Sequence, residues 1–317
     1  MKKIENIASV VFHHFHDFDK HKSSQGSISA KTFEKFINYL SDEYNLLSAD
    51  IWMEKFLSNT LSQEDIVITF DDALLCQYDI ALPVLEKYNL KAFWFLYSSY
   101  LDSNMEKLEI YRYFRNNFFG NVEEFYDSFF TFASRSSLKE RIDKSLNNFV
   151  PAEYLQEFSL YSDEDRIFRY IRDKVLSENE YFELMDSMID FYNMDIREVV
   201  TKLWITKDEI KNLSNLNHMI GLHSHSHPTD ISRYSYEEQL NEYSINLQKL
   251  ESITDVKIIS MSHPCGKYNN DTLQILEKLG IKVGFRADRK NMEIEKKYEM
   301  ARIDHSLLTD LINDVYA

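Results

Sequence analysis

The segment Ile-Val-Ile-Thr-Phe-Asp-Asp at residues 66–72 constrains the fold of this chain more than any other. Its apolar and β-branched residues predict a strand that is buried on both faces, as in a parallel sheet covered by helices. Two adjacent carboxylates, Asp71 and Asp72, end this segment. Because ligands bind outside the carboxyl ends of parallel strands, the pair predicts a functional site at the rim of the sheet.

Alternating strand and helix patterns extend on both sides of this segment. Strands are expected at residues 7–12, 66–70, 91–96, 219–223, 256–260, 281–285 and 300–304. Helices are expected at about 30–40, 74–88, 236–253 and 272–278. Such alternation predicts parallel strand pairing with the helices outside.

Residues 102–200 follow a different pattern. Charged residues alternate there with Phe, Tyr, Leu and Ile at helical spacing, and no strand pattern stands out. We therefore expect a helical insertion at 102–200 between two parts of one α/β domain, residues 1–101 and 201–317. The favoured role of the insertion is a cover or a dimerisation element, and a substrate-facing lid is the alternative.

The charge balance argues against a nucleic-acid partner. The 317 residues include 36 Lys and Arg against 52 Asp and Glu, a net charge of −16, whereas a phosphate backbone is bound by concentrated cationic side chains. Two cysteines give no disulfide framework. No stretch approaches the roughly 20 apolar residues of a membrane span. We expect a soluble, cytoplasmic protein without a transmembrane segment.

A second polar cluster lies at residues 221–228, Gly-Leu-His-Ser-His-Ser-His-Pro. A helix would place His223 and His227 on one face and His225 elsewhere, whereas a strand would place all three together. Gly221 and Pro228 argue against a regular helix, so spacing alone keeps His225 as a candidate. A carboxylate with two histidines is the ligand set of hydrolytic metal sites with open positions. We expect this cluster and the aspartate pair to form one site.

The segment Ser-His-Pro-Cys-Gly-Lys-Tyr at 262–268 predicts a tight loop directly after a strand. Such a loop can present a backbone N–H to an oxyanion, although an ordinary strand-to-helix turn explains it as well. A nucleophilic Cys265 ranks low, because no base is assigned to it. For the aspartates, the structural alternative is that one of them caps the helix expected from about residue 74.

Three motifs in this order resemble the polysaccharide deacetylase family, carbohydrate esterase family 4. They are Thr-Phe-Asp-Asp at 69–72, His-x-x-x-His at 223–227 and Pro-Cys-Gly at 264–266. The resemblance covers residues 1–100 and 200–305. It implies an α/β fold, an irregular (β/α)7 barrel with its site at the carboxyl ends of the strands. It also implies a metal-dependent hydrolase.

The resemblance further implies roles for individual residues. Asp72, His223 and His227 would hold one divalent metal ion, with zinc as the first choice. Asp71 would act as the general base, and the backbone N–H of Cys265 would bind the oxyanion.

The three motifs do not by themselves assign the general acid or the substrate contacts. His13 is the first choice for the acid that protonates the leaving amine, and His305 is the second. Arg286 is a candidate for the arginine that orients the base, because Ser262 stands where many family members carry that arginine. Arg286, Tyr268 and His305 are accordingly expected to line the substrate.

The expected function is N-deacetylation of an N-acylated amino sugar in cell-surface polysaccharide biosynthesis. The substrate would be nucleotide-linked, lipid-linked or an oligosaccharide. The alternatives are an O-deacetylase or deformylase with the same site, a catalytically silent metal-containing carbohydrate-binding protein, and a scaffold that acts through the helical insertion. The insertion could also form a homo-oligomer. Ala73, where the family usually has glycine, requires a turn that tolerates a Cβ, and Trp204 is expected in the core rather than against a sugar.

Overall fold

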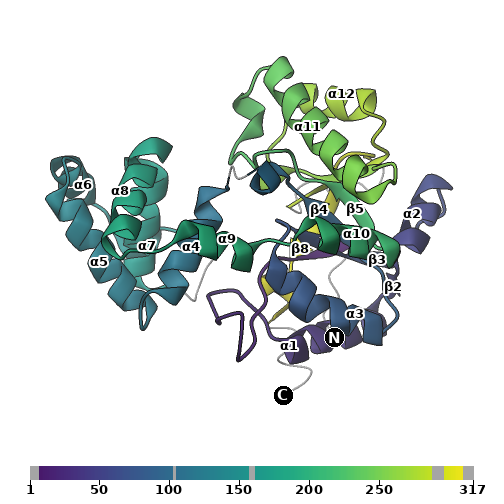
Figure 1. Cartoon of the computed structure of the whole chain (residues 1–317), viewed down its shortest axis with the longest axis horizontal. Coiled ribbons are helices and arrows are strands. Elements are labelled where there is room, and N and C mark those ends of the chain that lie inside the picture. Colours follow the sequence, from purple (N-terminus) through teal and green to yellow (C-terminus); the bar gives the residue numbers. More distant parts are fainter. Residues whose placement is uncertain (1–6, 103–104, 157–160, 288–295, 310–317) are drawn as a thin grey trace. The chain divides into compact units, whose positions relative to one another are not determined.

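The computed structural model describes residues 7–102, 105–156, 161–287 and 296–309. The chain divides into two compact units, Met1–Glu106 with Lys202–Ala317, and Lys107–Thr201. The second unit occupies the part of the chain for which a helical insertion is expected, and its described residues form helices without a strand (Figure 1). The outer ends of the expected division, residues 1–6 and 310–317, lie outside the described residues.

The first unit carries the strands. Their bounds are β1 Ser9–Phe12, β2 Asn45–Leu47, β3 Asp65–Asp71, β4 Phe93–Leu96, β5 Met219–Leu222, β6 Ser260–Ser262, β7 Val283–Arg286 and β8 Met300–Asp304. Its α-helices are α1 Ala30–Glu43, α2 Ala49–Leu57, α3 Leu82–Lys87, α10 Lys207–Asn215, α11 Tyr236–Thr254 and α12 Asn270–Lys278.

The second unit is built from α4 Lys107–Asn117, α5 Val122–Arg135, α6 Lys139–Leu146, α7 Asp163–Tyr170, α8 Glu178–Phe191 and most of α9 Ile196–Leu203. Short elements complete the chain: η1 Gln77–Ala81, η2 Ser99–Asp102, η3 Pro151–Glu153, η4 Ile171–Val175, η5 Ile231–Arg233 and η6 Pro264–Gly266. In the described part of the chain, no helix is both long and apolar enough to cross a membrane.

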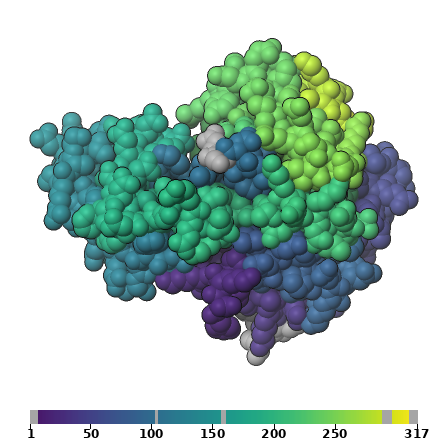
Figure 2. All heavy atoms as spheres, in the orientation of Figure 1, coloured from purple at the N-terminus to yellow at the C-terminus, as the bar shows by residue number. Residues whose placement is uncertain are grey.

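Seven strands close into a parallel barrel. They pair in the order β1-β8-β7-β6-β5-β4-β3, the pairing of β1 with β3 closes the ring, and β2 pairs with the start of β3. Because all pairings are parallel, the carboxyl ends of the strands meet at one rim. Helices surround the strands (Figure 1), and in the same orientation the atoms of α11 and α12 lie at the upper right of the space-filling view (Figure 2). The expected (β/α)7 barrel is confirmed.

The barrel interior changes from apolar to polar along the strands. Near the strand starts, Trp52, Phe93 and Phe285 are fully buried in one aromatic cluster. Side chains of alternate strand residues share a face. Val67 in this cluster is therefore followed on the same face by Thr69 and then by Asp71 at the rim.

Helix α1 forms where its amphipathic pattern predicts it. Ser29 caps its start by accepting a hydrogen bond from the backbone N–H of Thr32. Phe33 and Phe36 are fully buried and meet Phe12 of β1 edge-on, with ring centroids 4.9 and 5.4 Å away. These contacts attach the helix to the outside of the barrel beside β1.

Three local predictions differ from the structure. Strand β6 begins at Ser260 rather than at residue 256, because Asp255 ends α11 in the left-handed conformation and Val256 is 54% exposed. The helix expected at 74–88 is divided into η1 and α3, with Pro83 in the first turn of α3, where the missing N–H costs little. Strand β2 and helix α2 were not expected.

We expect Trp52→Ala to destabilise the barrel by about 3–5 kcal/mol, because it removes a fully buried aromatic side chain from the floor of the core. Urea unfolding measures the change. Ile51→Ala is the matched control on the same helix, since Ile51 is 47% exposed and its truncation should cost far less. If both variants lost the same free energy of unfolding, the structural role of the aromatic cluster near the strand starts would be contradicted.

Candidate metal centre and active site

The two aspartates reach the same rim through an unusual turn. Asp71 is the last residue of β3, and neighbouring residues of a regular strand point to opposite faces. Asp72 and Ala73, however, have φ angles of 78° and 57°, in the left-handed region that non-glycine residues rarely adopt. This turn reverses the chain, so that both carboxylates serve one site. It also accommodates the Cβ of Ala73, as expected.

Asp71 is held by a buried arginine. Arg302 on β8 is fully buried and donates to the two carboxylate oxygens of Asp71 at 2.7 and 2.6 Å. The hydroxyl of Ser262 donates to the same carboxylate at 3.2 Å and accepts from Arg302 at 2.5 Å. Arg302 also donates to the hydroxyl of Thr69 at 3.2 Å. The network fixes the orientation of the carboxylate.

The expectation that Arg286 orients the base is therefore wrong, because Arg302 has this position. Arg286 contributes its backbone carbonyl, which accepts from Nε of Arg302 at 3.2 Å, and its own side chain is buried. Burial opposes ionisation of Asp71, but the charge of Arg302, with His223 nearby, lowers its pKa below the usual value. Asp71 is thus held as a carboxylate.

Asp72, His223 and His227 form a candidate metal-ligand triad. Each offers one ligand atom, and these atoms lie within 4.8 Å of one another. An oxygen of Asp72 is 3.4 Å from Nε2 of each histidine. Nδ1–H of His223 donates to the carbonyl of Ser262 at 2.9 Å, which leaves Nε2 as the ligand atom. One carboxylate and two imidazoles suit Zn²⁺ and leave coordination positions open.

His225 turns away from this triad. Its Nδ1 hydrogen-bonds with the hydroxyl of Ser98 at 2.9 Å, and its backbone carbonyl accepts from the amides of Ser98 and Ser99. Its amide donates to Glu242 at 2.9 Å. The spacing of the histidines left His225 open as a metal ligand, and its position in the structure excludes it from the triad. His225 instead anchors the loop that carries the two candidate ligands His223 and His227.

His13 lies between two carboxylates at the rim. It follows β1, which is flanked by β3 and β8. Its Nδ1 is 3.5 Å from Asp304, and its Nε2 is 4.0 Å from Asp72. Burial alone would lower the pKa of His13, but its hydrogen bond to Asp304 and the charge of Asp72 raise it to about 9. The side chain keeps 30% exposure, so a ligand can reach it.

Sequence reasoning missed Asp304 and Gln77. Gln77 is fully buried, and its amide nitrogen donates to the backbone carbonyls of His13 at 2.8 Å and Asp71 at 2.6 Å. It therefore sets the spacing between the two strand ends that carry the candidate acid and base. The one available signal was position, since Gln77 begins η1 shortly after the aspartate turn and Asp304 ends β8.

Cys265 lies at the corner of a tight turn. It has a φ of 51°, and Gly266 follows at 65°. The amides of Gly266 and Lys267 close the turn on His263 and Pro264, while the amide of Cys265 takes no part in these bonds. Desolvation and the charge of Asp72 raise the pKa of the Cys265 thiol to about 12, which argues against a nucleophilic thiolate.

The remaining candidates lie in packed surroundings. His305 is buried and stacks on Phe12, and its Nε2–H donates to the carbonyl of Gly26 at 3.1 Å. His305 therefore belongs to the packing between β1 and α1. The expectation that it lines the substrate is corrected. Tyr268 stacks on His263 at 4.1 Å, and its hydroxyl donates to Glu299 at 2.7 Å. Its role towards a substrate stays a prediction.

Trp204 is 3% exposed and stacks on Tyr100, with ring centroids 5.6 Å apart. It also meets Tyr97 edge-on. These contacts confirm the expectation that Trp204 packs in the core.

The sequence model described as polysaccharide deacetylase matches residues 58–118 and 180–284 of this chain. No curated protein matches the chain in sequence.

Several solved structures share the fold. IcaB from Ammonifex degensii superposes with a TM-score of 0.57 at 13% identity, over 99% of this chain and 96% of that one. The deacetylase PplD from Streptococcus pyogenes, solved in complex with acetate, gives 0.54 at 16% identity, over 96% and 93%. A de-N-acetylase from Aggregatibacter actinomycetemcomitans gives 0.53 at 14% identity, over 94% of each chain. At such identities the likeness establishes the fold.

Replacing Arg302 by methionine should destabilise the protein by about 3–5 kcal/mol, because it leaves the buried Asp71 carboxylate without its partner. Urea unfolding at neutral pH measures the loss. Adding Asp71→Asn to this variant should recover part of it, since the unpaired charge is then removed. An exposed ion pair contributes up to about 1 kcal/mol. If Arg302→Met lowered the free energy of unfolding by less than this, the structural role of the buried Asp71–Arg302 pair would be contradicted.

Proposed function

The chain belongs to the polysaccharide deacetylase family, and we propose that it is a metal-dependent N-deacetylase that hydrolyses the amide of an N-acylated amino sugar. One observation carries the proposal. A carboxylate held by a buried arginine, Asp71, stands 3.8 Å from Nε2 of His223, beside the candidate metal ligands but outside the triad. A site that only bound metal would not need this second carboxylate.

Asp72, His223 and His227 would hold the metal. A divalent cation there, with Zn²⁺ as the first choice, would polarise the acyl carbonyl and lower the pKa of water. The donor set supports this assignment, since His223 already has its Nδ1–H engaged by the Ser262 carbonyl.

The chain's own groups divide the proton transfers. Asp71, kept ionised by Arg302, accepts a proton from the attacking water. The backbone N–H of Cys265 donates to the oxyanion that forms on the acyl oxygen. His13, whose pKa is raised to about 9 by its carboxylate neighbours against the effect of burial, carries the proton that the departing amine needs.

The acyl group is proposed as acetyl and the substrate as a nucleotide-linked, lipid-linked or oligosaccharide amino sugar. Two structural neighbours described as a deacetylase bound to acetate and as a de-N-acetylase support this choice. An O-acetyl ester or a formamide would use the same groups. The catalytically silent binding protein is the weaker alternative, because Asp71 and its arginine have no role in it.

The first experiment measures bound metal in the purified protein together with acetate and formate release from a panel of acylated amino sugars. One bound divalent ion and release that stops on chelation and returns with metal would support the proposal. Metal without release from any sugar or ester in the panel would favour the binding protein. Absence of metal after reconstitution would overturn the central assignment.

We expect His223→Ala and His227→Ala to lose bound zinc, because each removes one of three ligands. Loss of even a supporting contact typically costs about 10–100-fold in metal affinity, and loss of a ligand should cost more. Zinc titration of the metal-free protein gives the affinity without reference to activity. His225→Ala is the matched control and should bind zinc far more tightly than either ligand variant, since its side chain points to Ser98 and its backbone hydrogen bonds remain. Unchanged affinity in both ligand variants would refute the triad.

Asp71→Asn and His13→Ala should each lower turnover by about 10²–10⁴-fold, the usual contribution of a general base or acid, with bound metal retained. Turnover and metal content are measured on the same preparations. His305→Ala is the control for His13→Ala and should keep its turnover, because His305 stacks on Phe12 in the packing between β1 and α1. If His305→Ala lost turnover at constant metal and His13→Ala did not, the acid would be misassigned.

A further inference from the structure

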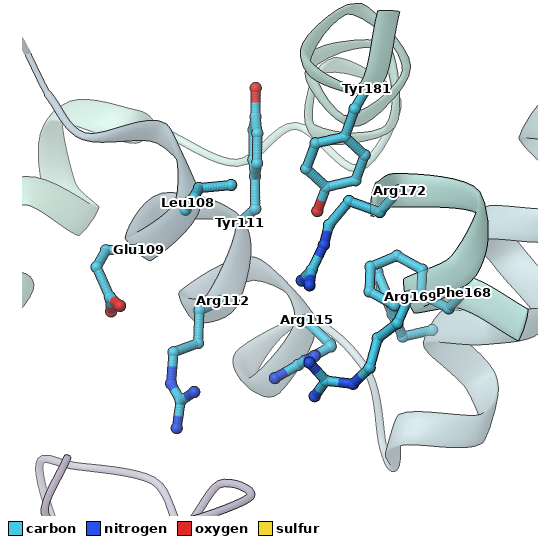
Figure 3. Close-up of a pocket in the computed structure, with 10 residues that line it drawn as sticks. Leu108, Glu109, Tyr111, Arg112, Arg115, Phe168, Arg169, Arg172 and Tyr181 are labelled. Carbon is cyan, nitrogen blue, oxygen red and sulfur yellow. The ribbon is translucent and has the colours of Figure 1, made fainter. Parts of the chain in front are cut away.

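The helical unit Lys107–Thr201 contains a cavity of about 180 Å³ that no part of the proposed function uses. Four arginines line it: Arg112 and Arg115 from α4, Arg169 from α7 and Arg172 from η4. Figure 3 shows the side chains of Arg115, Arg169 and Arg172 gathered beneath Tyr181 of α8, with Arg112 to one side. Such a gathering of cations is unexpected in a chain whose net charge is −16.

Arg115 is the least compensated of the four. Its Nε is buried and donates to no atom in the described part of the chain, and within the same residues no carboxylate lies within 4.0 Å of its guanidinium. The side chain of Arg115 is half-buried, and a buried N–H donor without an acceptor is costly. The position of Arg115 is therefore explained most simply by an acceptor from outside the chain.

Two of the other arginines have carboxylates nearby. Arg172 pairs with Asp173 at 2.6 Å, and Arg169 lies 3.8 Å from Asp165 and over the ring of Tyr161. Of the residues that line the cavity, Glu109 is the acidic one, against four arginines. The lining therefore keeps an excess of positive charge.

The arginines also oppose one another. Burial and the charge of Arg112 lower the pKa of Arg115. Burial lowers the pKa of Arg169 as well. Tyr161 and Asp165 oppose this shift, whereas the charges of Arg172 and Arg115 add to it. An anion between these arginines would offset both the cost of their burial and the repulsion between their charges.

We propose that this cavity binds the diphosphate group of an organic phosphate. The planar fork of a guanidinium matches phosphate oxygens two at a time, and a diphosphate offers enough oxygens and charge for several arginines, whereas one carboxylate does not. The rings of Phe125, Phe168 and Tyr181 in its lining provide an apolar wall for the organic part.

The test uses the full-length protein and isothermal titration with inorganic phosphate, pyrophosphate and uridine diphosphate. We expect pyrophosphate and uridine diphosphate to bind more tightly than phosphate and to raise the melting temperature. Arg115→Gln and Arg169→Gln should each weaken binding by about tenfold or more, equivalent to about 1.4 kcal/mol. Arg197→Gln is the matched control, because Arg197 belongs to the same unit and is 91% exposed, and it should bind as the unaltered protein does.

A structural role for the arginines predicts a different pattern. If Arg115 served the fold, Arg115→Gln would lower the melting temperature without ligand, whereas relief of repulsion should leave it equal or higher. Binding to vesicles that carry a lipid diphosphate, compared with soluble uridine diphosphate, separates the two sources of this group. The proposal is overturned if the unaltered protein binds none of these probes at millimolar concentration, or if Arg115→Gln and Arg169→Gln bind them equally well. Neither outcome depends on the barrel's activity.

Discussion

The ion pair between Asp71 and Arg302 is the interaction on which the rest of the barrel site depends. It lies inside the barrel, above a floor of buried aromatic residues, where an unpaired charge would be strongly destabilising. Both side chains are therefore held in one geometry, and Ser262 connects them to the candidate metal ligands. Its hydroxyl joins the pair, and its backbone carbonyl accepts from His223. The candidate base and the candidate metal centre thus share one rigid support.

The rim above this support is built from strained backbone. Asp72, Ser224, His227 and Cys265 all have left-handed φ angles, a conformation that costs of order 1–3 kcal/mol each for such residues. The closed ring of parallel strands compensates this cost, because strand pairing fixes where each loop begins. Two ligands and the candidate oxyanion donor are placed by these turns. Outside the rim, left-handed φ angles occur mostly at Asn and Asp residues such as Asn217 and Asp255, which adopt this conformation more readily.

The two units of the chain differ in how they use charge. In the barrel, buried charges are paired within the protein, as with Arg302, or flanked by carboxylates, as with His13. In the helical unit, arginines meet around a cavity with few carboxylates among them. The first arrangement fixes catalytic geometry, and the second favours an anion from outside. A diphosphate site in this unit would suit a chain whose proposed substrates include nucleotide-linked and lipid-linked sugars.

The sequence alone determined the alternation of parallel strands and helices, because this pattern depends on local signals. The barrel and the candidate metal triad were expected from the resemblance of three motifs to a family. Apolar runs that end in polar residues marked most strands and their polar ends. The spacing of the histidines left His225 open, and Asp72 meets His223 only because β4 pairs with both β3 and β5. Only the tertiary structure decided the partners of these groups. Arg302 meets Asp71 across 231 residues, and Asp304 reaches His13 only because β8 pairs with β1. The exclusion of His225 likewise depends on Ser98. Barrel closure sets such pairings, and no periodicity in the chain encodes which strand ends become neighbours.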